Sequence, residues 1–384
     1  MNKNETFPQK DVFINKTSSF LPNQPVTNDE IENYIGKIDG KSSRARSIIL
    51  RQNKIITRYY ALNTDQRITH SNAELAKSAI NLLFDNSKPE IDLLACGTSN
   101  ADLIIPSHAS MVHGLLDMNP VEIYSLSGVC LTGIQALKVA YLSILSQLSE
   151  KAVCCASELA SVGLLSKNFE LEYESLSKAD KNPYIAFEKD FLRFMLSDGA
   201  GAFLLEGSPN SDDFSLKIEW IEQTSYANEL PVCMYSGGEI QADGYVKGWK
   251  EFQTTDLMER SILMIKQNIK LLKDFAIKYW VDHIETVLLK HNVESNKINY
   301  VIPHVSSMFF YDLLDVELKS RHIQLPKSKW FTNLSSVGNI GSASIYIALN
   351  ELFYSGKLKK DDTILLLVPE SGRFSYGSVL LTVV

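Results

Sequence analysis

Short apolar runs of strand length alternate with helical patterns along most of this chain. Each run holds four to six residues, and several lead through a turn of small residues into a helical pattern. This alternation predicts an α/β protein whose sheets are largely buried between helices. The predicted strands are residues 90–95, 122–125, 152–157, 200–205, 300–303, 363–368 and 378–383, and the predicted helices are residues 130–148 and 342–354, with one or two more within 255–290.

The order of strand, small-residue turn and helix occurs once in each half of the chain. The turn is SGVC at residues 127–130 in the first half and VGNIG at residues 337–341 in the second. A polar, turn-rich stretch around residue 210 separates the two, which predicts an N-terminal half, 1–208, and a C-terminal half, 209–384. The charged stretch 168–190 lacks clean periodicity, and we expect it to be an inserted cap.

Composition and charge exclude several classes of protein. The chain has 384 residues, 45% of them apolar, and a net charge of −7, as expected for a globular protein with a core. The acidic balance argues against a nucleic-acid partner, because proteins that track phosphates usually present a basic field. No apolar run reaches the ~20 residues of a membrane span, and residues 1–10 lack the apolar core of a signal peptide. We therefore expect a cytoplasmic protein.

The cysteines indicate neither a metal site nor a disulfide framework. The chain has five of them, an odd number, and none lies at zinc-type spacing from a second cysteine or a histidine. Disulfides are not expected in the cytoplasm. Cys154 and Cys155 lie within an apolar run, where a free cysteine behaves as a small core residue.

Cys130 is the cysteine best placed to act as a nucleophile, because it stands where a predicted strand ends and a predicted helix begins. The positive end of a helix dipole lowers the pKa of a thiol and favours the nucleophilic thiolate. Gly128 and Gly133 on either side permit a sharp turn and the close approach of another backbone. A small buried residue at a tight turn would fit the position equally well.

Three further positions in the second half have both a chemical and a structural interpretation. His304 follows the predicted strand 300–303, at the edge where ligand sites of α/β sheets gather, although a lone histidine there is more often structural. The remaining histidines are less well placed, and His283 is expected to be exposed. Asn339 lies in a glycine-flanked turn that it would favour on conformational grounds alone. Gly372 lies between two predicted strands, where its amide could serve as an oxyanion donor or simply belong to a hairpin.

Cysteine, histidine and asparagine in this order, followed by a glycine-rich turn, resemble the thiolase-fold condensing enzymes, specifically the ketoacyl-[acyl-carrier-protein] synthase III family. The resemblance covers most of the chain. Its opening strand and helix correspond to residues 17–34, a small-residue strand end to 95–100, and LSDGAGAFLL at 196–205 is similar to another family segment. The resemblance implies an α/β fold of two similar halves in five layers, α-β-α-β-α.

The resemblance also implies roles for individual residues. Cys130 would take an acyl group from a thioester, and the amides of Cys130 and Gly372 would hold the oxyanion. His304 and Asn339 would hydrogen-bond the carbonyl oxygen of a second substrate and stabilise its enolate. No cofactor is implied, because the acyl groups would arrive on acyl carrier protein phosphopantetheine or on coenzyme A. The pocket residues implied by the family pattern are Ile105, Pro106 and Phe374.

Two further expectations concern partners. The loop 103–107 resembles the family segment that crosses into a partner's pocket, which implies a homodimer. The residues after His304 depart from the family pattern, since Val305-Ser306-Ser307-Met308-Phe309 stands where polar and often basic residues meet the carrier. A basic stretch elsewhere could serve an acidic carrier instead, although such a run is more often a solvated face. Its members are Arg44, Arg46, Arg51, Lys54 and Arg58. Arg373 also departs from the pattern, which usually has glycine there.

A narrower resemblance concerns the second substrate. VPESGRFSYG at 368–377, IPSHASMVHG at 105–114 and the segment 182–202 resemble ketosynthases of bacterial dialkylresorcinol and flexirubin-type pathways. These would use a β-ketoacyl thioester and yield a cyclohexanedione precursor of a dialkylresorcinol. The alternatives are a decarboxylating synthase III that uses a malonyl thioester, a plain acyltransferase that makes esters or amides, and a degenerate partner subunit, which the three retained residues disfavour.

Overall fold

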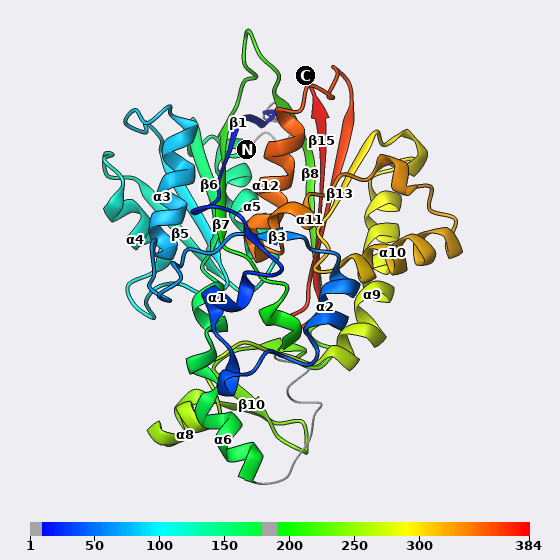
Figure 1. Cartoon of the computed structure of the whole chain (residues 1–384). Helices are drawn as coiled ribbons and strands as arrows, with labels where there is room; N and C mark the ends of the chain where they lie inside the picture. Colours follow the sequence, from blue (N-terminus) through cyan, green and yellow to red (C-terminus); the bar gives the residue numbers. More distant parts are fainter. Residues whose placement is uncertain (1–9, 179–189) are drawn as a thin grey trace, which may run out of the picture.

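The computed structural model describes residues 10–178 and 190–384, and its main element is a mixed sheet of nine strands. The sheet crosses the whole molecule (Figure 1). In spatial order its strands are β13 (Tyr300–Pro303), β14 (Thr363–Glu370), β15 (Ser375–Val383), β8 (Leu216–Ser225), β1 (Phe13–Phe20), β7 (Gly199–Glu206), β6 (Lys151–Glu158), β4 (Leu93–Thr98) and β5 (Glu122–Ser127).

The sheet consists of two halves that meet at a narrow seam. Strands β1 and β8 pair through only two residue pairs, Phe13 with Lys217 and Ile14 with Leu216. On one side β4 pairs in parallel with both β5 and β6, and on the other β13 pairs in parallel with β14. The connection between the halves runs from the end of β7 to the start of β8, around the predicted join at residue 210.

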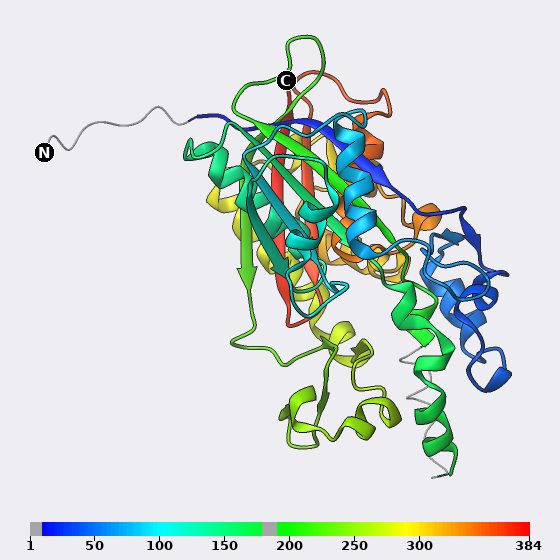
Figure 2. The same cartoon turned by 90° about the vertical axis from the view of Figure 1, so that its left-hand side faces the viewer.

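Helices cover both halves of the sheet and fill the space between them. Helices α5 (Thr132–Leu145) and α12 (Ser344–Phe353) pack in one apolar cluster with strands of both halves, and so form the central layer. Helices α3 (Asn72–Leu83) and α4 (His108–Leu115) cover the outer face of the N-terminal half, while α9 (Ile269–Lys290) and α10 (Met308–Ser320) cover that of the C-terminal half (Figures 1 and 2). The predicted five-layered thiolase-like α/β fold is therefore confirmed.

A smaller region lies beyond the ends of the strands, at the bottom of Figure 1. Helix α6 (Glu170–Lys178), from the predicted cap 168–190, packs there beside α8 (Thr254–Glu259). The rest of that prediction, residues 179–189, lies outside the described residues.

The other short elements are β2 (Val26–Thr27), α1 (Ile31–Ile35), α2 (Arg46–Asn53), β3 (Thr57–Arg58), β9 (Met234–Tyr235), β10 (Gly238–Ile240), β11 (Val246–Gly248), β12 (Lys266–Gln267) and α11 (Leu334–Val337). No helix of the described residues has the length and apolar character needed to cross a membrane.

Two predicted boundaries near the site are wrong, for physical reasons. Strand β4 extends to Thr98, beyond the predicted strand end at residue 95, because β5 and β6 pair with it on both sides. Helix α5 begins at Thr132 rather than at Cys130, because the carbonyl of Leu131 accepts its first hydrogen bond, from the amide of Gln135 at 3.0 Å. Cys130 therefore lies in the turn itself.

Candidate active site

Cys130 lies in the turn between β5 and α5, and the carboxylate of Glu370 binds the backbone of this turn. Oε2 of Glu370, at the end of β14, accepts hydrogen bonds from the amides of Val129 and Leu131, both at 3.1 Å. These amides flank Cys130, so one side chain from the C-terminal half fixes the backbone on both sides of the thiol. The Cys130 amide donates to no other residue in the described part of the chain.

The Cys130 thiol does not have the lowered pKa that its place before a helix predicts. The residue is buried, with 8% of its surface exposed. Burial raises the pKa of Cys130, and the nearby carboxylates of Glu370 and Glu158 raise it further. The expectation of a dipole-activated thiolate is therefore wrong in the unliganded chain, and nucleophilic attack by this thiol needs a proton acceptor.

His304 follows β13, as predicted, and its side chain is available for a ligand. The backbone amide of His304 donates to the carbonyl of Leu367 at 2.8 Å, which continues the β13–β14 pairing beyond the strand end. Burial lowers the pKa of His304 to about 4, so the ring is neutral at neutral pH. Among the described residues neither ring nitrogen has a hydrogen-bond partner.

In the side-chain amide of Asn339, the oxygen has a hydrogen-bond partner and the nitrogen has none among the described residues. Its Oδ1 accepts a hydrogen bond from the amide of Gly341 at 3.0 Å. Its backbone bridges to the segment before β7, where it accepts from the Ser197 amide and donates to Met195. The Nδ2 group has no acceptor among the described residues, so it can donate to a ligand.

The Gly372 amide is also free, and its loop reaches the cysteine turn. The carbonyl of Gly372 accepts from the amides of Cys233 and Met234, whereas its N–H has no acceptor in the described part of the protein. A methyl group on Gly372 would lie 3.2 Å from Cγ2 of Val129, the residue before Cys130. The two amides predicted to form the oxyanion hole therefore belong to segments that touch.

The loop of Asn339 packs against the same end of α5. A methyl group on Gly133 would lie 2.5 Å from the carbonyl oxygen of Ser342. The carboxylate of Glu158, at the end of β6, accepts from the amides of Ser342 and Ser99, each at 3.1 Å, and from both serine hydroxyls. Glu158 thus joins the ends of β6 and β4 to the segment that follows Asn339.

Glu158 and Glu370 are the site residues that sequence reasoning missed. A charged residue directly after the apolar run of residues 152–157 was the available signal for Glu158. Glu370 stands two residues before Gly372 in the quoted segment, but its link to the Cys130 turn, more than 200 residues away in sequence, has no local signature.

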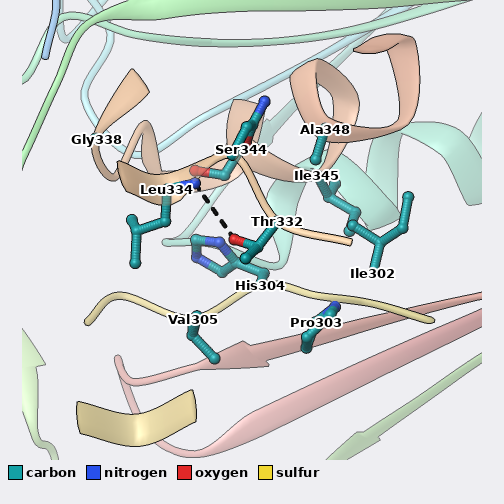
Figure 3. Close-up of a pocket in the computed structure, with 11 residues that line it drawn as sticks. Ile302, Pro303, His304, Val305, Thr332, Leu334, Gly338, Ser344, Ile345 and Ala348 are labelled. Carbon is teal, nitrogen blue, oxygen red and sulfur yellow. Dashed lines mark hydrogen bonds between the residues drawn. The ribbon is translucent and has the colours of Figure 1, made fainter. Parts of the chain in front are cut away.

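A narrow pocket opens beside His304 (Figure 3). The imidazole points from the end of β13 toward the segment that carries Gly338 and Ser344. Within the pocket wall the Leu334 amide donates to the Thr332 hydroxyl at 3.3 Å. Neither Cys130 nor Asn339 lines this pocket, so it contacts only the histidine of the predicted set.

The predicted pocket residues separate into two groups. Phe374 is fully buried in a left-handed conformation, φ 56°, and packs edge-on against Phe275. Ile105 is 83% exposed, and with Pro106 it belongs to a surface loop rather than to a pocket of the same chain. Arg373 donates to the Leu230 carbonyl at 3.0 Å, which anchors the loop that carries Gly372.

Several polar side chains are more buried than expected. Arg58, in the basic stretch, is fully buried and donates to Asn28, and Arg46 also donates to Asn28. Only Arg44, Arg51 and Lys54 of that stretch are exposed. The expectation of an exposed His283 is wrong, because this residue is enclosed between α9 and the sheet. Its ring nitrogens contact Thr224 at 3.0 Å and Ser378 at 2.9 Å.

The sequence and the structure of this chain are similar to those of several known proteins. Residues 288–383 match the family model described as 3-oxoacyl-[acyl-carrier-protein (ACP)] synthase III C terminal. The chain is 27% identical to the beta-ketoacyl-[acyl-carrier-protein] synthase III of Aliarcobacter butzleri, over 77% of each chain. It is similar to the solved structure of AbyA1, a tetronic acid condensing enzyme, with a TM-score of 0.74 and 18% identity over 97% of this chain and 99% of that one. It is also similar to Xanthomonas campestris OleA with bound lauric acid and lauroyl-CoA, with a TM-score of 0.69 and 19% identity over 98% and 100%.

Proposed function

The chain is a thiolase-fold relative of the 3-oxoacyl-[acyl-carrier-protein] synthase III family, and from that premise we propose that it is a ketosynthase that loads an acyl chain on Cys130. The loaded chain then forms a carbon–carbon bond with a second acyl thioester. Amides of Cys130 and Gly372 receive the thioester oxyanion, while His304 and Asn339 receive the enolate oxygen of the second substrate. The scheme needs no cofactor besides the thioester carriers.

One observation carries this proposal: the hydrogen-bond donors that the scheme needs, on Asn339, His304 and Gly372, have no partners among the described residues. Oδ1 of Asn339 is occupied by the Gly341 amide, which leaves Nδ2 as a donor. The pKa of His304 is lowered by burial, so a neutral ring can donate from one nitrogen. Preorganised donors of this kind stabilise developing negative charge and require little reorganisation during the reaction.

We infer that the second substrate is a β-ketoacyl thioester. The likeness to dialkylresorcinol and flexirubin-type ketosynthases supports this choice, and the product would be a cyclohexanedione precursor of a dialkylresorcinol. The alternative is a malonyl thioester, whose decarboxylation would generate the enolate, and the similarity to a synthase III supports that possibility. An ester- or amide-forming acyltransferase would need no enolate donors, so the free Nδ2 of Asn339 disfavours it.

The carrier proposal rests on the exposed part of the basic stretch. Arg44, Arg51 and Lys54 are exposed on and beside α2, and the apolar side chains of Ile48 and Ile56 are exposed among them at 42% and 63%. A surface of this kind suits an acidic carrier with an apolar contact face. Coenzyme A thioesters would serve equally well in the chemistry. The exposed loop of Ile105 supports the homodimer.

Intact-protein mass spectrometry after mixing with octanoyl-CoA tests the loading step. The wild-type protein should gain one octanoyl group, and Cys130→Ala should gain none. Cys96→Ala is the matched control, because it removes another buried thiol that lies in the outer apolar cluster, away from the site. An adduct that persists in Cys130→Ala would refute the proposed nucleophile.

Asn339→Ala separates the two half-reactions. It should still accept the octanoyl group, because the loading oxyanion contacts other amides, but condensation should fall ~100-fold or more with the loss of one enolate donor. Products are identified by mass spectrometry with malonyl-CoA and β-ketooctanoyl-CoA offered separately. Condensation by Asn339→Ala at the wild-type rate would contradict the assigned role, and product from malonyl-CoA alone would favour the decarboxylating alternative.

A further inference from the structure

Glu370 is a partly buried acid in the site that the scheme above does not use. Its Oε2 is occupied by the amides of Val129 and Leu131. Its Oε1 has no hydrogen-bond partner among the described residues. A methyl group placed on Gly372 would lie 3.4 Å from this Oε1. The free oxygen of the carboxylate therefore faces the loop whose amide is proposed for the oxyanion hole.

Glu370 and His304 lie on the same face of the sheet. Ile302, Leu366 and Val368 all point into the central layer of α5 and α12. Side chains alternate along a strand, so residues 304 and 370 continue that inward-facing series. Pro303 pairs with Leu367 across β13 and β14, which places His304 beside Val368 and Glu370 about 7 Å further along β14. The acid and the enolate-binding histidine thus face the same space.

We propose that Glu370 is the general base that removes the α-carbon proton of a β-ketoacyl second substrate. This inference rests on the proposed ketosynthase function and selects one of its two candidate substrates. A malonyl thioester forms its enolate by losing carbon dioxide and needs no such base. A β-ketoacyl thioester keeps all its carbons, so a proton must leave the carbon that forms the new bond.

The step balances with groups present in the chain. The α C–H bond breaks, the proton passes to Oε1 of Glu370, and the electron pair becomes the enolate that His304 and Asn339 bind. The enolate carbon attacks the carbonyl carbon of the acyl-Cys130 thioester. The new carbon–carbon bond forms as the carbon–sulfur bond breaks. Glu370, now protonated, returns its proton to the departing sulfur of Cys130.

The surroundings of Glu370 suit this cycle. Burial raises the pKa of the Glu370 carboxyl, and the two amide hydrogen bonds only partly oppose this. A carboxylate with a raised pKa is a stronger base, and its acid form releases the proton less readily until a basic thiolate appears. The charge of Glu370 also raises the pKa of Cys130, which places the two groups within electrostatic reach of each other.

Single-turnover kinetics of the acyl-enzyme provide the test. Wild type and Glu370→Gln are first loaded with octanoyl-CoA and then mixed with β-ketooctanoyl-CoA. Glutamine keeps an oxygen for the amides of the cysteine turn, so loading should be retained within a few-fold. Consumption of the acyl-enzyme should fall ~100-fold or more, and its rate should no longer rise with pH in the range where Glu370 ionises.

A matched control is Glu206→Gln, a half-buried carboxylate at the end of β7, beside the start of β6 and so at the other end of the sheet. It should behave as wild type in both steps. Glu370→Asp keeps the acid but shortens its reach, and it should condense faster than Glu370→Gln even where it loads more slowly. Equal loss of loading and condensation in both Glu370 variants would show an anchoring role alone and overturn the proposal.

Two further outcomes are decisive. Condensation by Glu370→Gln at the wild-type rate would overturn the base, and so would a wild type that condenses malonyl-CoA but leaves β-ketooctanoyl-CoA untouched. In both cases the ketosynthase assignment would survive. A wild type that neither loads nor condenses would instead refute the proposed function itself.

Discussion

At the scale of single residues, the site depends on backbones that approach without side chains between them. Gly133 is one example, because an added methyl group would meet the carbonyl oxygen of Ser342 at 2.5 Å and the ring of Tyr346 at 3.0 Å. This contact joins the start of α5, beside Cys130, to the segment after Asn339. A backbone atom cannot rotate away, so any larger residue at 133 must move one of the two segments.

Gly133→Ala is therefore expected to lower the free energy of unfolding by about 1–3 kcal/mol, the range typical of overpacked cores. Condensation should suffer more than loading, because the displaced segment carries Asn339. Denaturant unfolding measures the first effect, and the half-reactions described above measure the second.

The control for this substitution is Gly114→Ala in α4. Nothing lies within 4 Å of a methyl group there, and alanine is a better helix former than glycine by about 1 kcal/mol. This variant should be as stable as wild type or more stable. Equal stability of Gly133→Ala and wild type would show that the two segments are not pressed together as the structure has them.

The residues that the sequence could identify are those with a local signature. Cys130, His304 and Asn339 each stand at a strand end or in a glycine turn, and their order along the chain gave the resemblance to the condensing enzymes. Contacts between residues that are far apart in the sequence could not be predicted from it. The carboxylate of Glu370 meets the cysteine turn only because β14 and α5 come together in the folded chain, and the raised pKa of Cys130 follows from that contact and from burial.

At the scale of elements, the long helix α9 is tied to the sheet by a buried polar contact. His283 connects it to Thr224 on β8 and Ser378 on β15. Burial lowers the pKa of His283 to about 4, and likewise those of His108 and His304. Each ring is therefore neutral in the folded chain at pH values where the unfolded chain has begun to take up protons.

This difference gives the direction of a pH effect on stability. As pH falls from about 6.5 to about 4, the unfolded state binds protons that the folded state does not, so the free energy of unfolding decreases. His283→Gln can keep both hydroxyl contacts without a titrating ring, and it should remove up to about 3 kcal/mol of that decrease. Buried Asp198, with its pKa raised to about 6, acts in the opposite sense in both proteins and cancels from the comparison.

Denaturant titrations of wild type and His283→Gln at several pH values between 4 and 7 measure the effect. The stability of wild type should fall further than that of His283→Gln between pH 7 and pH 4, so the difference between the two curves should change by up to about 3 kcal/mol over this range. Parallel curves would mean that the His283 ring takes up its proton as readily in the folded chain as in the unfolded chain, and that burial does not hold it neutral.

Most of the helices and strands could be predicted from the sequence, and the predictions that were wrong have physical causes. Strand 300–303 was placed correctly because its apolar run is bounded by a proline and a polar residue. Strand β4 extends further than predicted, since neighbours on both sides give its small residues backbone partners. The region of β10, β11 and α8 was missed as a unit, because it assembles from short polar segments that lack a clear period.

At the scale of the whole molecule, one end of the large sheet is left open. Strand β5 pairs only with β4, and most of its residues are exposed. The loop before α4 is exposed as well, with Leu103, Ile104 and Ile105 at 46%, 84% and 83%. An unpaired edge with consecutive exposed apolar residues is typical of a surface that another chain covers. The proposed homodimer would cover this end, with the loop entering the partner's site.

Ile105→Asp should therefore weaken the dimer and impair condensation together, because a buried charge at an apolar interface is costly. Sedimentation analysis of the wild type should give twice the 43.1 kDa chain mass. The variant should shift toward the monomer at micromolar concentration. Leu148→Asp is the control, since Leu148 is 79% exposed but follows the far end of α5. A wild type that sediments as a monomer, or a variant that stays dimeric and fully active, would show that this loop serves neither association nor the site.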